Sequence, residues 1–534
     1  YCHPQDPCWP TPVDVSELAA AMTPGLRNLS WSGAGHPLTG AIPLHSPNNQ
    51  PLYGVGATPG SLAPVYSRVT SDESGVCFVS GFSPEFCLVS VRNNPMLGWA
   101  PAFVVFPLNA DDVAAAVTFA ATHRLCVSVA GTGHDFINRH SCDDSILIRT
   151  ALLQDRVWNP DGSLTLGAGT VFSMAQWEAS TKGRYVASGW SKSVGVVGWT
   201  LGGGHGPYAR KAGLGVDNLL AAEVVVGNGT IVTATPSQHS DLLWALRGGG
   251  GSTWGVVTAV TLQTHVNPVG GFNRVSASVD SLSVCDTIQM DAYVDGYLQW
   301  AQSLPPAWSG GLAYFTPTYS GATSCAASWS LFIYYLYQGP VTDADYAIYA
   351  EALEALTGPI NAQFLNTSRD IVESTQLDYL VPTPFLSPSG SSAGGLPSVL
   401  IHQDAAFSGV VNAAIKTSLR TCAFDSSSCE RLEVYDDVHY PPGSAADVSI
   451  SAGFRSARFH VIMGAASLHT LQTLWYPLGN HSYFSESAFI MDDATWQHRL
   501  WGENAATLQA VKGKYDSASV FWCRMCIGDN ITYA

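Results

Sequence analysis

Three glycine clusters, each directly after an apolar run, are the feature that most constrains this chain. They fall near residue 131, over 195–206 and over 248–255, in a sequence of 534 residues. Glycine lets the backbone approach a ligand closely, and successive N–H groups can then point into one concavity that binds phosphate. A single cluster indicates an ordinary turn, but three clusters after strands predict a site for a phosphate-bearing cofactor.

The first cluster closes a strand–helix–strand unit. The pattern predicts a buried strand over 102–108, a helix over 109–124 capped by its asparagine, and strands over 126–131 and 145–150. The loop "AGTGHDF" leaves the second of these strands. Its histidine, His134, has three competing interpretations: a metal ligand, an ordinary turn residue, or a group against a bound cofactor.

The pattern predicts further elements along the chain. They are a helix over 14–22, a strand over 163–169, a helix over 171–183, a hairpin over 221–235, a helix and strand within 239–264, a strand over 328–338, and helices over 343–358 and 493–515. A chain of this length exceeds one hydrophobic core. We therefore predict four parts: a disulfide-stapled extension over 1–97, then 98–264, 265–480 and 481–534.

The charge balance restricts the partners. The chain has 24 Lys and Arg against 41 Asp and Glu, a net charge of −17. Such a surface repels polyanions, so we expect no nucleic acid and no anionic membrane partner. No apolar run reaches the ~18–20 residues of a membrane span. We expect a monomer that acts on a small molecule.

The cysteines and sequons indicate a secreted glycoprotein. The chain has 12 cysteines, and close pairs include Cys2/Cys8, Cys77/Cys87, Cys422/Cys429 and Cys523/Cys526. The "CRMC" pair has zinc-ligand spacing, but no second compatible pair accompanies it. Asn-x-Ser/Thr sequons lie at Asn28, Asn228, Asn366, Asn480 and Asn530, and the sequence starts at Tyr1 rather than Met. Together these features favour an oxidising, extracellular location.

The common nucleotide and hydrolase motifs do not fit. A Walker loop needs Gly-Lys-Ser/Thr, which is absent, and "GTGHDF" breaks the dinucleotide fingerprint at its last position with no helix signal after it. "GWSKS" nearly matches the G-x-S-x-G elbow of serine hydrolases, but Ser193 stands where glycine is required.

The order of the motifs resembles the vanillyl-alcohol-oxidase-type flavoproteins, in the berberine-bridge-enzyme-like branch and its fungal secreted members. The matching stretches are "CHPQDPCWP", "PAFVVFPLNADDV", "AGTGHDF", "VGVVGWTLGGG", "GLGVDN", "GSTWGVVT" and "WGENAATL". The resemblance implies an α+β fold, with an FAD-binding domain of the p-cresol methylhydroxylase type, built from two α+β subdomains. A substrate domain with a helix-covered antiparallel sheet would follow it. Residues 265–480 carry none of these motifs.

The resemblance also implies the cofactor site. His134 matches the histidine that bonds covalently to the 8α methyl of the flavin, and this resolves its three interpretations in favour of the cofactor. The other residues implied at FAD are Ala130, Gly131, Thr132, Gly133, Asp135, Gly189, Ser193, Val194, Gly195, Gly198, Trp199, Gly203, Gly204, Gly255, Val256, Val257 and Asn504. We expect no metal.

One departure from the family bears on the tether. Many relatives attach the flavin by a second bond from a cysteine three residues before the Val-Gly of the second loop. Here that residue is Ser191, which cannot form a thioether, so we predict a single covalent bond. Cys126 and Cys142 lie near in sequence, and we expect them to form a disulfide.

The residues of the chemistry are less definite. His205 lies where relatives place a side chain facing the flavin, so it ranks first as a substrate-contacting or proton-handling group. The tyrosine that deprotonates the substrate in relatives corresponds to Tyr483, but Ser485 and Glu486 replace the following pair. Either Tyr483 or Glu486 is therefore the base. The "HQD" stretch, His402 to Asp404, is a further candidate.

The expected function is an FAD-dependent oxidase that converts an alcohol, saccharide or phenolic compound and reduces O2 to hydrogen peroxide. Two alternatives stay open. One is a tailoring flavoenzyme that closes rings or dehydrogenates a secondary metabolite. The other is a secreted binding glycoprotein without a cofactor.

Overall fold

The structure is a computed structural model of the 534-residue chain. It describes residues 1–22, 29–31, 102–137, 139–140, 142, 144–191, 194–283, 287–304, 308–319, 327–339, 342–344, 347, 365–368, 396–424, 432–438, 447–463, 468–488 and 494–529. Most of the predicted helix over 343–358, the pair Cys77/Cys87 and most of the extension over 1–97 lie outside these residues.

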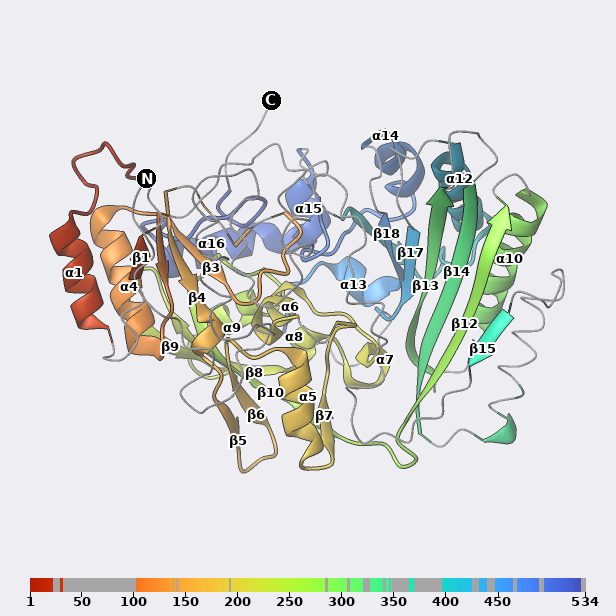
Figure 1. The fold of residues 1–534 in the computed structure, drawn as a ribbon, viewed down its shortest axis with the longest axis horizontal. Coiled ribbons are helices and arrows are strands. Elements are labelled where there is room, and N and C mark those ends of the chain that lie inside the picture. The colour runs from red at the N-terminus through yellow and green to blue at the C-terminus, as the bar shows by residue number, and fades with distance from the viewer. Residues whose placement is uncertain are drawn as a thin grey trace.

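The first sheet has the order β1-β2-β4-β3. Strands β2 (Phe103–Val105), β4 (Ile146–Arg149) and β3 (Val127–Ala130) are parallel, and β1 (Leu29–Trp31) is antiparallel to β2. Helix α4 (Ala110–His123) connects β2 to β3, and the Asn109 side chain accepts a hydrogen bond from the Asp112 N–H at 2.9 Å. Helix α1 (Pro12–Ala21) packs on α4 (Figure 1). The predicted strand–helix–strand unit is confirmed.

The second sheet has the order β5-β6-β10-β8-β9 and is antiparallel throughout. Its strands are β5 (Arg156–Trp158), β6 (Leu164–Gly167), β8 (Leu219–Val225), β9 (Ile231–Ala234) and β10 (Val256–Leu262). The hairpin β8–β9 is the one predicted from the Asn-Gly turn. The helices in this part are α5 (Phe172–Ser180), α6 (Val196–Gly202), α7 (Ala209–Ala212), α8 (Gly215–Asn218) and α9 (Ser240–Leu246). Strands β7 (Arg184–Val186) and β11 (Thr264–Val266) pair separately.

The large sheet has the order β15-β12-β14-β13-β17-β18-β16 and is antiparallel. Its strands are β12 (Phe272–Ser283), β13 (Trp308–Tyr319), β14 (Ala327–Gln338), β15 (Leu365–Ser368), β16 (Ser398–His402), β17 (Leu432–Asp436) and β18 (Ala457–Met463). Helices α10 (Thr287–Ser303) and α12 (Gly409–Phe424) cover one face (Figure 1), and Tyr297, Ile415, Phe315 and Val434 share one buried core there.

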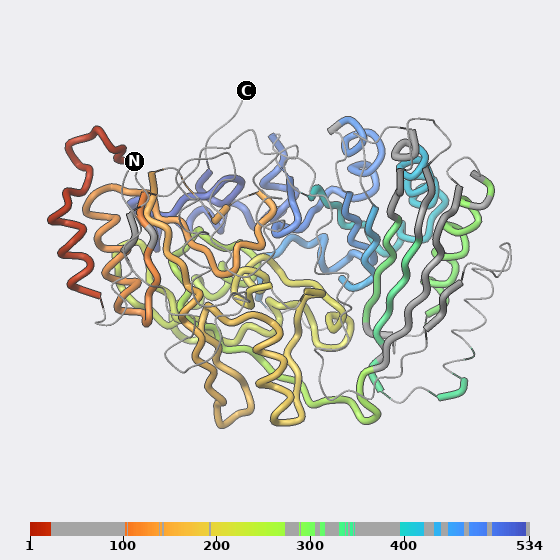
Figure 2. Tube along the Cα trace, viewed as in Figure 1, coloured from red at the N-terminus to blue at the C-terminus, as the bar shows by residue number. Residues whose placement is uncertain are grey.

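The chain then returns to the first two sheets (Figure 2). Past α13 (Ala452–Ser456), α14 (Leu468–Thr470) and the π-helical turn η6 (Leu471–Trp475) come α15 (Trp496–Trp501), η8 (Gly502–Asn504) and α16 (Ala505–Tyr515). The helical prediction over 493–515 is confirmed, but the helix is divided at Gly502, which adopts a positive φ of 58° and ends α15. Beyond α16, the Val127 N–H of β3 donates to the Val520 carbonyl at 2.8 Å.

Three disulfides join cysteines of the described residues: Cys2–Cys8, Cys126–Cys142 and Cys523–Cys526. The expected pairing of Cys126 with Cys142 is confirmed, and the zinc interpretation of "CRMC" is excluded because both of its sulfurs are bonded to each other. In the part of the chain described here, no helix has the length and apolar character of a membrane span.

Candidate active site

A cavity of about 480 Å³ has walls from two parts of the molecule. The first wall, here named the loop wall, is formed by residues 129–136, 189–191, 194–195, 198–199 and 251–252. The second, named the sheet wall, is formed by Tyr314, Phe332, Glu433, Tyr435 and Ile462 of the large sheet. The volume lies in the usual range of about 300–1,000 Å³ for a small-molecule site.

The loop wall consists of backbone turns held to one another. The Gly195 N–H donates to the Thr132 hydroxyl at 3.2 Å, which ties the loop after β3 to the start of α6. The Arg149 guanidinium donates to the Gly131 carbonyl from the neighbouring strand end. A Cβ added at Gly198 or at Gly251 would meet no atom within 4 Å, so both glycines border open space. This wall therefore fits a ligand bound against backbone.

Most residues predicted to bind the cofactor lie on this wall. The cavity is lined by Ala130, Gly131, Thr132, Gly133, His134, Asp135, Gly189, Val194, Gly195, Gly198 and Trp199. Ser193 lies outside the described residues. Six other predicted residues do not line the cavity: Gly203, Gly204, Gly255, Val256, Val257 and Asn504.

Those six residues have structural partners instead. A Cβ at Gly204, where φ is 75°, would lie 2.8 Å from the Trp199 ring, so glycine there allows close packing. Gly203 lies against Ile450 and Tyr483 in the same way. Val256 and Val257 pair with β8, and Gly255, directly before them, packs against the backbone of Val225 in β8. The Asn504 amide donates to the carbonyls of Ser449 at 3.2 Å and Ile450 at 3.0 Å.

The sheet wall follows from strand register. Tyr314 on β13 lies opposite Phe332 on β14 and Glu433 on β17, and Glu433 lies opposite Ile462 on β18. Side chains alternate between the two faces of a sheet, so this row points away from α10 and α12. The Tyr435 hydroxyl donates to Glu433 Oε2 at 2.5 Å and lies 2.8 Å from the Tyr314 hydroxyl.

His205 connects the two walls. It follows α6, and its Nδ1 lies 3.0 and 2.9 Å from the two carboxylate oxygens of Asp437, directly after β17. Its Nε2 lies 3.1 Å from Glu486 Oε2. Asp437 also accepts a hydrogen bond from the Trp190 indole N–H at 2.5 Å. His205 is 4% exposed and Asp437 is fully buried, so the two carboxylates hold this ring in a fixed orientation.

The charges decide the protonation of His205. Burial by itself lowers the pKa of a histidine, but the adjacent Asp437 and Glu486 outweigh it and raise the pKa of His205 to about 10. At neutral pH this ring is therefore a cation with both nitrogens protonated. It can donate hydrogen bonds and stabilise negative charge, but it cannot accept a proton.

Glu486 and Tyr483 lie on residues 481–487, a segment that runs beside β16. Leu400 of β16 donates its N–H to the His481 carbonyl at 2.9 Å, and the Ser398 hydroxyl donates to the Glu486 carbonyl at 2.6 Å. Burial raises the pKa of the Glu486 carboxyl, against the opposing charge of His205. Burial and the charge of Glu486 raise the pKa of Tyr483 above its usual range, so the phenol stays protonated.

Four residues around His205 were not predicted from the sequence: Asp437, which bonds it, Trp190, which bonds Asp437, Tyr435, whose ring packs on it, and Glu433, which bonds Tyr435. Two consecutive acids at the end of the apolar run "LEVYDDV" nevertheless mark a strand end with buried charge. The candidate pair His402 and Asp404 is a wrong prediction: both side chains are exposed, at 46% and 83%, and neither lines the cavity.

Three side chains of the cavity region have the residue types of a metal site. His205, His460 and Glu486 place three ligand-type atoms within 4.8 Å of one another. The ring nitrogens of His205 already face two carboxylates, and the resulting cation needs no metal to balance it. Burial and the charge of His205 lower the pKa of His460 well below its ordinary value, so that ring is neutral. We assign no metal to this group.

Comparison with known proteins agrees with this geometry. A family model for an FAD binding domain matches residues 101–235, and one for berberine and berberine-like proteins matches residues 480–528. The VAO-type flavoprotein oxidase VAO615 of Thermothelomyces thermophilus is 27% identical over 82% of this chain and 77% of its own length. The chain contains an FAD binding domain and a berberine-like domain, and it is an FAD-dependent oxidoreductase.

Another relative of this FAD-linked oxidoreductase is sor8 of Hypocrea jecorina, 25% identical over 99% of this chain and 90% of that protein. Among solved structures, the VAO-type flavoprotein MtVAO615 of Myceliophthora thermophila superposes with a TM-score of 0.73 at 22% identity, over 99% of this chain and 97% of that one. The glucooligosaccharide oxidase of Acremonium strictum, which carries a 6-S-cysteinyl, 8α-N1-histidyl FAD, gives 0.63 at 19% identity over 81% and 92%. The predicted fold is confirmed.

Proposed function

We propose that this FAD-linked oxidoreductase oxidises a hydroxyl group of an alcohol, saccharide or phenolic substrate, with FAD bound covalently through His134, and that O2 is reduced to hydrogen peroxide. The observation that carries the proposal is the position of Glu486 in the cavity, held by the His205 cation opposite the loop that contains His134. When bound, FAD supplies the acceptor for the substrate's hydride.

Glu486 is the proton acceptor that the geometry favours. A base must lose its own proton before reaction, and its pKa should approach the working pH. His205 is already protonated and the pKa of Tyr483 lies above its usual range, whereas burial makes the Glu486 carboxylate a stronger base than an exposed one. In this proposal Glu486 takes the hydroxyl proton, His205 holds the carboxylate in place, and Tyr483 donates a hydrogen bond to the substrate oxygen.

A single tether is the simplest arrangement for this site. His134 and Ser191 both line the cavity, and serine cannot form the thioether that the Acremonium strictum enzyme carries. The described cysteines near the loop wall form two disulfides, Cys126–Cys142 and Cys523–Cys526. No described thiol is therefore available for a second bond.

The tether is tested by acid denaturation and gel electrophoresis under ultraviolet light. We expect flavin fluorescence to migrate with the wild-type polypeptide and to disappear from the band of the His134→Ala variant. His140→Ala is the matched control, because His140 lines the same cavity a few residues away. Fluorescence that stays with His134→Ala would contradict the assignment.

The reaction is tested with a panel of sugars, primary alcohols and phenols, with hydrogen peroxide and flavin reduction measured together. Peroxide in proportion to product supports the oxidase. Flavin reduction without peroxide in air would instead indicate a dehydrogenase or a tailoring enzyme that uses another acceptor.

We also propose that the protein is a secreted glycoprotein. Three disulfides lie in the described residues, and the sequon residues Asn228 and Asn480 are exposed. Disulfides persist mainly outside the reducing cytosol. Expression in a secreting fungal host should give a protein whose mass falls on treatment with an endoglycosidase, and an unchanged mass would contradict the proposal.

A further inference from the structure

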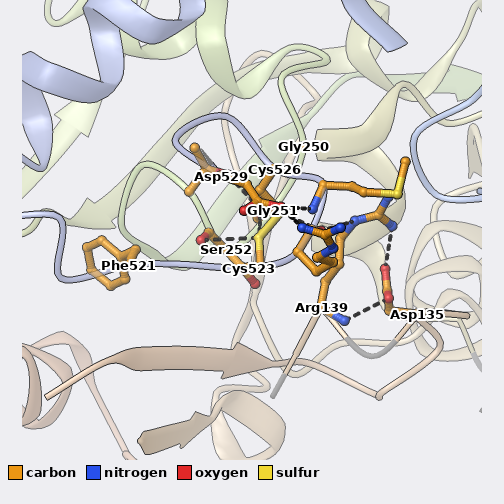
Figure 3. The surroundings of a disulfide bond; sticks show 12 residues. Asp135, Arg139, Gly250, Gly251, Ser252, Phe521, Cys523, Cys526 and Asp529 are labelled. Atoms are coloured by element: carbon orange, nitrogen blue, oxygen red, sulfur yellow. Dashed lines mark hydrogen bonds and ion pairs between the residues drawn. A yellow bond between two sulfur atoms is a disulfide. The ribbon is translucent and has the colours of Figure 1, made fainter. Parts of the chain in front are cut away.

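The C-terminal turn, residues 523–529, is closed by the Cys523–Cys526 disulfide and lies against the loop wall (Figure 3). Cys523 Sγ is 3.7 Å from the Gly251 carbonyl oxygen and 3.7 Å from that of Ser252. Both cysteines are 1% exposed. The disulfide itself does not line the cavity, but it backs the two residues of the third glycine cluster that do.

The same turn also holds the loop that contains His134. The Arg139 guanidinium donates to the Arg524 carbonyl at 3.2 Å through Nε. Through Nη1 it donates to Asp135 Oδ2 at 2.9 Å (Figure 3). Asp135, directly after His134, in turn accepts the Ile137 N–H at 3.0 Å. Arg139 is 3% exposed, so this chain of contacts is shielded from water. The C-terminal turn thus contacts both sides of the loop wall.

The turn is braced internally. The Asp529 carboxylate accepts the Met525 N–H at 2.7 Å and the Arg524 guanidinium at 3.1 Å. Before the turn, the Lys512 ammonium donates to the carbonyls of Thr253 at 2.7 Å and Phe521 at 2.8 Å. With these anchors, the position of the disulfide fixes the distance between the His134 loop and the Gly251–Ser252 loop.

We propose that the Cys523–Cys526 disulfide is a positioning element for FAD, which holds the two loops apart at the separation that the cofactor needs. This inference rests on the proposed binding of FAD to the loop wall. A loop that is rigid in its bound conformation loses less entropy on binding, so opening the disulfide should weaken the affinity for FAD. By linkage, bound FAD must then protect the same disulfide from reduction.

The first experiment measures FAD affinity in the His134→Ala background, where the cofactor can exchange. We expect the added Cys523→Ser and Cys526→Ser substitutions to raise the Kd for FAD about tenfold. The matched control is Cys2→Ser with Cys8→Ser, which opens a disulfide beside the end of α4, away from the cavity. An equal Kd in the test and control variants would overturn the proposal.

A second variant tests the same turn without removing the disulfide, so that a folding defect caused by the missing cysteines cannot explain the result. Asp529→Asn keeps both cysteines and weakens only the brace of the turn. We expect its Kd for FAD to rise in the same direction, by a few-fold. The visible spectrum of the bound flavin should also change, because the polarity around the ring depends on where the two loops lie. An unchanged Kd with an unchanged spectrum would contradict the proposal.

The third experiment uses the His134→Ala protein, in which FAD can exchange, and a phosphine reductant. Alkylation and peptide mass spectrometry would give the reduction rates of Cys523–Cys526 and Cys2–Cys8 with and without FAD. We expect FAD to slow the first several-fold and to leave the second unchanged, and equal slowing of both would overturn the proposal. Because FAD binds this variant without a covalent bond, the protection is measured independently of the assigned tether.

Discussion

The two walls of the cavity are built in different ways. The loop wall presents backbone, glycine and the ring of His134, and its residues lie within short motifs. The sheet wall presents side chains from four strands, and Phe332, Tyr314, Glu433 and Ile462 share a row only because the strands pair in one register. A site formed by backbone needs a local sequence that lets the chain come close to its ligand. A site formed by side chains needs only residues that alternate between the two faces of a strand, and many sequences satisfy that. The loop wall can therefore be recognised in the sequence, and the sheet wall cannot.

The largest effect should come from Glu486, the proposed proton acceptor, which lies on the segment beside β16 and not on the loop wall. We expect Glu486→Gln to lower kcat roughly 10²- to 10⁴-fold, because the amide cannot accept the substrate proton. The flavin content should stay unchanged, since FAD is proposed to depend on the loop wall. Glu433→Gln is the matched control, a carboxylate of the same cavity that bonds Tyr435 rather than His205. Equal losses in both variants would show that the two carboxylates are not distinguished.

The second largest effect should come from the contact between His205 and Asp437, and it should appear in the free energy of unfolding. Asp437→Asn leaves the buried His205 cation with one carboxylate, and breaking such a pair costs about 3–5 kcal/mol. The free energy of unfolding from denaturant titration would measure it. Asp404→Asn, which changes an exposed carboxylate, should cost little. A stable Asp437→Asn protein would mean that the walls do not depend on this bond.

Gly204 and Gly198 lie close in sequence, but substitution should affect stability at Gly204 and FAD binding at Gly198. Gly204→Ala should lower the free energy of unfolding by about 1–3 kcal/mol, because φ is 75° and the Cβ would lie 2.8 Å from Trp199. Gly198→Leu should leave stability nearly unchanged and weaken FAD binding, because its side chain would enter the open space of the cavity. Thermal unfolding and flavin content distinguish the two outcomes, and a reversed pattern would contradict the division between packing and ligand glycines.

The last expected effect concerns pH. The pKa of His205 is raised in the folded state, from 6.5 to about 10, so its contribution to stability is complete below a pH of about 6.5 and is lost as the pH rises through about 10. The difference in free energy of unfolding between the wild type and His205→Gln should shrink over this interval. A difference that grows with pH would mean that His205 is neutral in the folded protein.

The sequence by itself determined the elements and the loop wall. The Asn109 cap, the strand before "AGTGHDF" and the Asn-Gly hairpin are local signals, and each depends on residues a few positions apart. The same locality explains why Gly131, Thr132 and His134 line the cavity, whereas Gly203, Gly204 and Asn504 do not line it. Those residues match a motif, but what they face depends on Trp199, Tyr483 and the carbonyls of 449 and 450.

Only the tertiary structure decided which groups share a proton. His205 and Asp437 are 232 positions apart and His205 and Glu486 are 281 apart. No local pattern encodes their distance, because it results from strand order in the large sheet and from the return of residues 481–487 to the edge of β16. The charge of His205, the raised pKa of Glu486 and the position of the C-terminal disulfide behind Gly251 all depend on burial, and burial is a property of the folded chain.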